Sequence, residues 1–375
     1  MHVLSGMSKG GGERVAVELA NEAAKNNDTV TILAGWPENP DHLQNTIHPN
    51  VQIRFISQRK RFAYIKSIGW ILANKKLICN QDVLHCHLTF GVVFGAVANF
   101  FLKKIGRNKT PIVIETNHAV GMPVPAFNLW LHSLMASQLN GMALMASDPY
   151  WNNFIVKHQH LKAKFIPNGI SVLTPGIDSA QKKFLLKKFN IPEDYKYIIG
   201  TISMLRPDRK PLLYVPLFYE IYKFLGSQVH FILGGSGDEY NKIRILVDER
   251  GLSENFHLIG LVNEPVQILS LLDMYVAPSV EGSAGISMIE AALCRVPVAG
   301  IQMVEGYEAK SEDWVWSHTD INEVAKKINL LLQNEEERKN LAEHQNKYVT
   351  EHFTSEAMYN AYNSFYKQIL SSGTT

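Results

Sequence analysis

The chain has 375 residues, of which 46% are hydrophobic and 19% charged, which describes a globular protein long enough for two domains. Its three cysteines form no CxxC pair, which excludes a disulfide framework and a cysteine zinc site and favours a reducing, cytoplasmic compartment. The opening residues indicate a strand and lack the features of a secretory signal peptide. The most apolar run, Leu88–Leu102, is short for a membrane span and therefore predicts a buried helix.

The net charge of +2 is unevenly distributed. Residues 1–170 contain 17 Lys and Arg against 9 Asp and Glu, or +8, so the remainder carries 20 against 26, or −6. The excess predicts that the first half faces something anionic. Its cations interleave with apolar residues, as in a helix lying on an anionic membrane surface, at Arg59, Lys60, Arg61, Lys66, Lys75 and Lys76. An ordinary solvated helix face explains them equally well, whereas no nucleic-acid-binding motif is present.

Strand-like and helix-like segments alternate along the first half. The strands are expected at residues 1–6, 30–34, 51–56, 83–85, 112–116, 142–146 and 165–166, with helices between them, for example at 14–26 and 126–139. A loop rich in Pro and Gly follows at 167–176, and a second series has strands at 197–203, 228–233, 256–259, 274–277 and 296–299. This alternation predicts an α/β protein with two doubly wound, Rossmann-like domains, residues 1–170 and 171–354. An amphipathic helix at about 355–372 ends the chain.

Glycines and histidines mark the strand ends of the first domain. Gly11 and Gly12 open a helix without forming a dinucleotide fingerprint or a Walker A loop, and they allow a ligand to approach the helix N-terminus. His87 and His118 follow strands at the edge where ligands bind in such sheets. Single histidines are often structural, and a His-x-His with a distant third histidine is also a conceivable metal set. No acidic or cysteine partner has ligand spacing, so we expect no metal.

The second domain carries cations and glycines in equivalent places. Arg206, Arg209 and Lys210 follow the first strand of the series and would neutralise a diphosphate. Gly235 and Val262 follow the next two strands, where backbone lies near a nucleotide. An exposed basic turn and plain strand-to-helix connections are the structural alternatives.

The region 277–291 is the most informative part of the sequence. A buried strand leads into a turn containing Glu281, and a helix beginning at Ser287 carries Glu290. Gly285, Ile286 and Ser287 would present a helix N-terminus to a diphosphate, with the two carboxylates taking sugar or ribose hydroxyls.

The whole pattern resembles the GT-B glycosyltransferases of family four, also called glycosyl transferases group 1. The resemblance is carried by Gly10–Ala16, by Asp82–His87, and by Glu281 and Glu290 bracketing the Gly-rich turn. It implies two Rossmann-like domains facing a cleft, a final helix that crosses back to the first domain, and a retaining transferase without a metal cofactor. The donor would be a nucleotide sugar, UDP- or GDP-linked. The acceptor would be a saccharide or lipid-linked saccharide of the cell envelope, reached from the cytoplasm or the inner membrane face.

The resemblance also implies residue roles. His118 and Glu281 would be catalytic. Gly11, Gly12 and His87 would bind the acceptor, and the donor would be bound by Arg206, Arg209, Lys210, Gly235, Val262, Gly285, Ile286, Ser287 and Glu290.

Two departures from the family pattern leave alternatives open. Met204 stands where the family has a polar residue, and Glu281 and Glu290 are separated by eight residues instead of seven. A degenerate GT-B protein that binds nucleotide sugars as a scaffold, or a nucleotide-sugar epimerase, is compatible with these departures.

Overall fold

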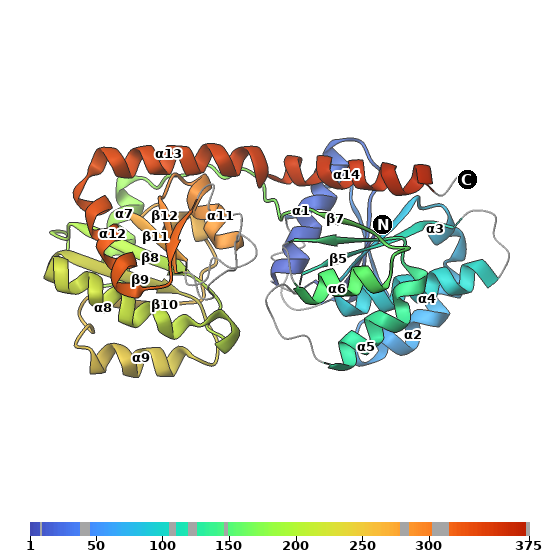
Figure 1. Cartoon of the computed structure of the whole chain (residues 1–375), viewed down its shortest axis with the longest axis horizontal. Helices are drawn as coiled ribbons and strands as arrows, with labels where there is room; N and C mark the ends of the chain where they lie inside the picture. The colour runs from blue at the N-terminus through green and yellow to red at the C-terminus, as the bar shows by residue number, and fades with distance from the viewer. Residues whose placement is uncertain are drawn as a thin grey trace. The chain divides into compact units, whose positions relative to one another are not determined.

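The computed structural model divides the chain into two compact units. Unit 1 comprises Met1–Ser171 and the C-terminal segment from Thr354, and unit 2 comprises Val172–Phe353 (Figure 1). The structure describes residues 1–7, 10–37, 46–104, 110–118, 126–145, 149–277, 285–301 and 315–372. In these ranges no helix combines the length and apolarity that a membrane crossing requires.

Unit 1 is built on a seven-stranded parallel sheet in the order β3-β2-β1-β4-β5-β6-β7. Its strands are β1 (His2–Gly6), β2 (Thr31–Trp36), β3 (Gln52–Phe55), β4 (Val83–His87), β5 (Ile112–Asn117), β6 (Gly141–Leu144) and β7 (Lys162–Phe165). The central strands are almost entirely buried because helices cover both faces, as a parallel sheet requires.

The helices of unit 1 are α1 (Gly11–Lys25), α2 (Lys60–Ala73), α3 (Lys75–Cys79), α4 (Leu88–Lys104), α5 (Ala126–Met135), α6 (Pro149–Lys157) and α14 (Ser355–Ser372). A short 3₁₀ turn, η2 (Ala136–Gln138), ends the helical region expected to reach residue 139. The apolar run after β4 forms α4, which packs so closely on the sheet that a Cβ on Gly95 would lie 2.3 Å from Sγ of Cys86. The expected buried helix is therefore present.

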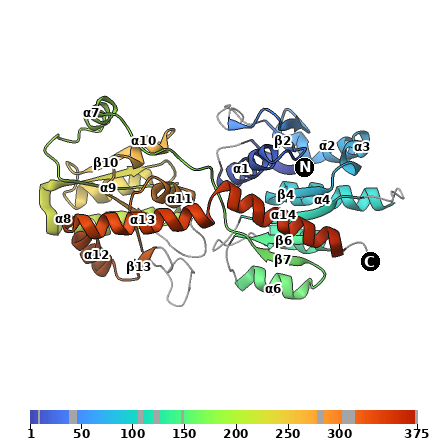
Figure 2. The same ribbon diagram turned by 90° about the horizontal axis from the view of Figure 1, so that it is seen from above.

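The final helix α14 packs on α1, and the two cover one face of the unit 1 sheet, opposite α2, α4 and α5 (Figures 1 and 2). Its hydroxyl groups bond to the sheet and to α1: the hydroxyl of Tyr362 lies 2.7 Å from Oγ1 of Thr116 on β5, and Ser355 donates to Glu22 of α1 at 3.0 Å. Buried residues such as Met358 and Phe365 complete the contact.

Unit 2 contains a six-stranded parallel sheet in the order β10-β9-β8-β11-β12-β13. Its strands are β8 (Tyr197–Ile202), β9 (Val229–Gly234), β10 (Phe256–Gly260), β11 (Met274–Ala277), β12 (Val298–Ile301) and β13 (Trp316–His318). Its helices are α7 (Ser179–Lys188), α8 (Tyr214–Leu225), α9 (Tyr240–Glu249), α10 (Pro265–Leu269), α11 (Ile286–Leu293), α12 (Ile321–Gln333) and α13 (Glu335–His352), with 3₁₀ turns η3 (Pro207–Arg209), η4 (Pro211–Leu213) and η5 (Gly226–Gln228). The sequence patterns did not predict β13, whose three residues are too few to show a period.

Both sheets reverse their winding once. In unit 1 the strands that follow β1 are added on one side of it and those that follow β4 on the other side. In unit 2 the same holds for β8 and β11. At such a switch point the connections that leave the two neighbouring strands turn to opposite faces, which opens a crevice at the carboxyl ends. The two expected Rossmann-like folds are therefore confirmed, each with its own switch point.

Candidate active site

The switch point of unit 1 brings together three elements that the sequence marked separately. After β1 the chain enters α1, with Gly10 as its N-cap and Gly11 exposed. His118 immediately follows β5, and its ring lies against the first turn of α1. A Cβ on Gly12 would be 3.2 Å from Cγ of His118, closer than side chains normally pack. Glycine at this position therefore leaves the space that the imidazole occupies.

His87 lies behind His118 in the sheet. Its Nδ1 is 3.1 Å from Nε2 of His118, and its Nε2 is 3.2 Å from Nδ1 of His2. His87 is completely buried, and both of its ring nitrogens are engaged by other histidines. This placement argues against direct contact between His87 and an acceptor, because the ring reaches the crevice only through His118.

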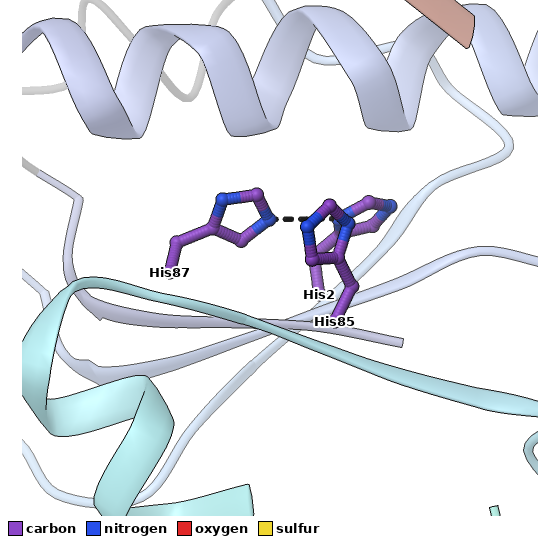
Figure 3. Close-up of side chains that lie close together, drawn as sticks. All are labelled: His2, His85 and His87. Carbon is purple, nitrogen blue, oxygen red and sulfur yellow. Dashed lines mark hydrogen bonds between the residues drawn. The ribbon is translucent and has the colours of Figure 1, made fainter. Parts of the chain in front are cut away.

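His2, His85 and His87 form a buried cluster under a helix (Figure 3). One nitrogen from each lies within 4.8 Å of the others, a spacing compatible with a metal ion. His85 is nevertheless occupied, since its Nε2 lies 2.6 Å from Oγ1 of Thr116 and its Nδ1 lies 2.7 Å from the hydroxyl of Tyr366. The cluster is thus already hydrogen-bonded within the protein.

Burial keeps these imidazoles uncharged. It lowers the pKa of His118 from 6.5 to about 4. It also lowers the pKa values of His2, His85 and His87 well below 6.5, and the neighbouring histidines add to these shifts. At neutral pH each ring therefore has one donor nitrogen and one acceptor nitrogen.

In unit 2, glycines hold the loop after β8 against the loop after β9. Gly235 has φ +147°, and a Cβ there would lie 1.8 Å from the carbonyl oxygen of Ser203. Leu205 donates its N–H to Ser236 at 3.0 Å and accepts from Glu239 at 2.9 Å. These bonds fix the backbone that leads into the cationic residues.

Arg206, Arg209 and Lys210 are exposed on that fixed loop. Lys210 has φ +47°, so the chain turns sharply between the two short 3₁₀ helices η3 and η4. Met204, which departs from the family pattern, is half exposed beside them. Val262 packs over the end of β9, because a Cβ on Gly234 would lie 2.5 Å from its Cγ2.

The other side of this switch point is the N-terminus of α11. The helix begins at Ile286 with Gly285 as an exposed N-cap, and a Cβ on Gly285 would meet nothing within 4 Å. The backbone N–H groups of a first helical turn have no partners within the helix, so this open end suits an anion. The expected helix start at Ser287 is one residue late, and Glu281 lies outside the described residues.

Glu290 is buried, 2% exposed, on the inner side of α11. Tyr275 lies close to it on β11 and donates to the carbonyl of Ile202 at 3.1 Å. Burial raises the pKa of Tyr275 to about 12, and the Glu290 carboxylate contributes to the increase. Tyr275 therefore links the end of β8 to the helix after β11.

Comparison with known families agrees with this geometry. Residues 9–178 match the model of "Glycosyltransferase Family 4", and residues 181–348 match that of "Glycosyl transferases group 1". The chain belongs to the family-four GT-B glycosyltransferases. The two matches adjoin just inside unit 2. The first includes α1 and β4 beside the switch point of unit 1, and the second includes β8 and β11 of unit 2.

Some similar proteins span nearly the whole chain and others less than half of it. An N-acetyl-alpha-D-glucosaminyl L-malate synthase of Bacillus anthracis is 24% identical, over 97% of this chain and 95% of its own length. N,N'-diacetylbacillosaminyl-diphospho-undecaprenol alpha-1,3-N-acetylgalactosaminyltransferase of Campylobacter jejuni is 30% identical, over 44% of this chain and 43% of its own. HepE of Anabaena, solved with UDP and glucose, shares the fold, with a TM-score of 0.74 and 14% identity. The match covers 98% of this chain and 100% of the HepE chain.

Three residues that pack behind the two switch points were not found from sequence. His2 and Tyr366 contact the histidines from positions far away in the chain, and Tyr275 lies inside a strand. The prediction of a buried strand at 274–277 marked Tyr275 only as a core residue. No local pattern identifies such contacts, because they depend on which strands and helices become neighbours.

Proposed function

We propose that this glycosyltransferase moves a sugar from a nucleotide-diphosphate donor to a saccharide or lipid-linked saccharide acceptor, with retention of anomeric configuration and without a metal ion. The observation that carries the proposal is the pairing, at one switch point, of an exposed cationic loop with an open helix N-terminus. Arg206, Arg209 and Lys210 supply charge, and Gly285–Ser287 supply backbone N–H groups. Together they suit a leaving diphosphate.

This arrangement offers the charge stabilisation that a metal ion supplies in other transferases. Fixed cations and a helix dipole neutralise the developing negative charge without reorganisation at the moment of reaction. Glu290 would accept hydrogen bonds from hydroxyls of the ribose or sugar. Glu281, the other expected carboxylate, would accept them from hydroxyls of the transferred sugar. In unit 1, His118 would contact the transferred sugar or the acceptor, with Gly11 and Gly12 beside it.

The relatives suggest which donors to test first. The Bacillus and Campylobacter enzymes are named for N-acetylhexosamine transfer, and HepE was solved with UDP. We infer a UDP-N-acetylhexosamine as the first candidate donor, with GDP- and ADP-sugars as the comparison. The polyprenyl-diphosphate acceptor named for the Campylobacter relative is the model for an envelope-glycan acceptor.

The composition of one face of unit 1 supports the proposal that the acceptor lies at an anionic membrane. Helix α4 contacts both α2 and α5, and none of the three contains an acidic residue. Large apolar side chains are exposed on this face at Tyr64, Ile65, Ile68, Leu72, Phe100, Phe127, Trp130 and Leu134. Arg59, Lys60, Arg61, Lys66, Lys76, Lys103 and Lys104 are exposed on or beside the same helices, and Lys75 is partly exposed. We call this set the α2–α4–α5 face, and its mixture suits peripheral binding to anionic lipid.

The test of function is nucleotide release from a panel of UDP-, GDP- and ADP-sugars, with and without chelator, for the full chain and for Glu290→Ala. The matched control is Glu254→Ala, which removes an exposed carboxylate of unit 2 far from α11 in sequence. Release that resists chelator, disappears in Glu290→Ala and persists in Glu254→Ala supports the proposal. Release abolished by chelator contradicts metal independence, and an inverted anomer in the product contradicts retention.

Calorimetric titration with the donor and analysis of its products distinguish a transferase from the two alternatives, a scaffold protein and an epimerase. Micromolar binding without turnover, with every acceptor class tested, would favour the scaffold protein. Conversion of the donor into its epimer without transfer would favour the epimerase.

A further inference from the structure

Three imidazole rings form a continuous chain from the switch point of unit 1 into its interior. The first contact joins Nε2 of His118 to Nδ1 of His87 at 3.1 Å, and the second joins Nε2 of His87 to Nδ1 of His2 at 3.2 Å. The ring centroids are 5.4 Å apart in both steps. His118 is partly exposed, whereas the other two rings are buried and must find their hydrogen-bond partners within the protein.

Only two arrangements of N–H protons are possible along this row of three rings. A neutral imidazole has one N–H donor and one lone pair, and each nitrogen–nitrogen contact needs one of each. If His118 donates from Nε2, His87 must donate from its own Nε2 to His2, and Nδ1 of His118 presents a lone pair. If the direction is reversed, Nδ1 of His118 carries the proton. The tautomer of His118 is therefore coupled to those of the two buried rings.

The geometry points to His87 and His2 as positioning residues that hold His118 in one orientation and one tautomer toward the sugar. This inference rests on the proposed role of His118 in transfer. In each of the two arrangements the relay, meaning His118, His87 and His2, sets whether the other nitrogen of His118 donates to or accepts from a ligand hydroxyl. A free histidine would sample both tautomers and several ring orientations.

The surroundings stabilise the relay from the side. The ring of His85 lies 4.0 Å from that of His87, centroid to centroid, and is itself held by Thr116 and Tyr366. His85 belongs to the cluster of Figure 3, but its hydrogen bonds go to Thr116 and Tyr366 and not to the relay. A metal ion bound by His2, His85 and His87 would have to displace these bonds, so relay and metal site are mutually exclusive.

Two variants of His87 each remove one of its two hydrogen bonds and keep the other. An asparagine amide reaches about the position of Nδ1 and can still bond to His118, whereas a glutamine amide reaches about the position of Nε2 and can bond only to His2. Tyr366→Phe is the matched control, because it removes one partly buried hydrogen bond from the same cluster but leaves the relay intact.

The first readout is ¹⁵N NMR of imidazole nitrogens in the donor-free full chain, with His118 assigned from His118→Ala. We expect one dominant tautomer of His118 in the wild type and in Tyr366→Phe, and averaged tautomers in His87→Gln. An unchanged His118 spectrum in His87→Gln would overturn the relay. Zinc bound one to one and lost in His2→Asn would also overturn it.

The second readout is turnover. We expect kcat to fall at least tenfold in His87→Gln with the donor KM changed less than threefold, partial rescue in His87→Asn, and less than a twofold effect in Tyr366→Phe. Equal losses in His87→Gln and Tyr366→Phe would contradict a positioning role. The tautomer measurement needs no turnover, so failure of the proposed function and failure of the relay are distinguishable.

Discussion

The ring of His118 occupies the space that a side chain at Gly12 would need: a Cβ there would lie 3.2 Å from Cγ of the imidazole. Gly12 lies in the first turn of α1, and His118 follows β5, so two residues more than 100 positions apart in the chain restrict one another. The contact explains a glycine inside a helix, where glycine normally costs about 1 kcal/mol relative to alanine.

Gly12→Ala should therefore separate activity from stability. Alanine favours the helix by roughly 0.5–1 kcal/mol, but its methyl group displaces the His118 ring by a few tenths of an ångström. We expect an unchanged or slightly raised melting temperature and about a tenfold loss of kcat. Gly69→Ala in α2 is the matched control, because a Cβ there meets nothing within 4 Å. It should gain the same stability and keep full donor turnover; a similar loss of turnover in both variants would refute this explanation.

Gly235→Ala should impair donor binding through the backbone. Its φ of +147° and the 1.8 Å approach to the Ser203 carbonyl leave no space for a Cβ, so the loop carrying Arg206 must move. We expect at least a tenfold rise in donor Kd by calorimetry and a loss of about 3 kcal/mol or more in unfolding free energy. Gly251→Ala also has a positive φ, +65°, but open space around it. It should cost about 1 kcal/mol and leave the Kd unchanged, and equal Kd values for both variants would contradict the prediction.

The buried histidines should make unfolding sensitive to acid. Burial lowers the pKa values of His2, His85 and His87 well below 6.5. Above pH 6.5 these rings are neutral in both states; below it the unfolded chain binds protons that the folded chain excludes. Stability should fall between pH 6.5 and 5, by at most about 1.4 kcal/mol per pH unit for each ring. Chemical denaturation at pH 7.5, 6.5 and 5.5 measures the slope.

His132 has the opposite effect on the pH dependence of stability. Glu115, at 3.1 Å, raises the pKa of His132 above 6.5 although burial opposes the shift. Its contribution is complete below pH 6.5 and is lost as the pH rises through the folded-state value. His132→Gln should therefore remove a gain in stability that the wild type makes as the pH falls from 7.5 to 6.5, and should leave the slope below pH 6.5 unchanged. His85→Gln should instead make the slope below pH 6.5 shallower. A changed slope below pH 6.5 in His132→Gln, or an unchanged one in His85→Gln, would show that other groups control the titration.

The α2–α4–α5 face should bind anionic vesicles. Replacing Arg59, Lys60 and Arg61 with glutamine removes about 1 kcal/mol of attraction per charge, or roughly a hundredfold in partition coefficient. Flotation with vesicles containing phosphatidylserine measures it, and added salt should weaken the wild type. The control replaces Lys183, Lys187 and Lys188, which are exposed on α7 of unit 2. Equal binding by both triple variants would exclude this face as the docking surface.

Local patterns were sufficient for the order of elements and for many candidate residues. Buried parallel strands are short apolar runs, and the turns that follow them need glycine or cations at defined positions, so β8, β11 and the loop before Lys210 were recognisable. The boundaries were less accurate, since β12 begins at Val298 instead of residue 296 and β13 was missed. Short strands carry too few residues for their period to locate an end.

The sequence by itself determined the alternation of strands and helices, the two sheets, and the cations and histidines at their carboxyl ends. Such features depend on interactions between residues close in the chain. Only the tertiary structure decided that His87 bonds to His2, 85 residues away, and that Tyr366 of α14 bonds to His85, 281 residues away. These contacts depend on strand order and on the packing of α14 against unit 1, and a distance of 3 Å between two ring nitrogens is set only when the whole unit has folded.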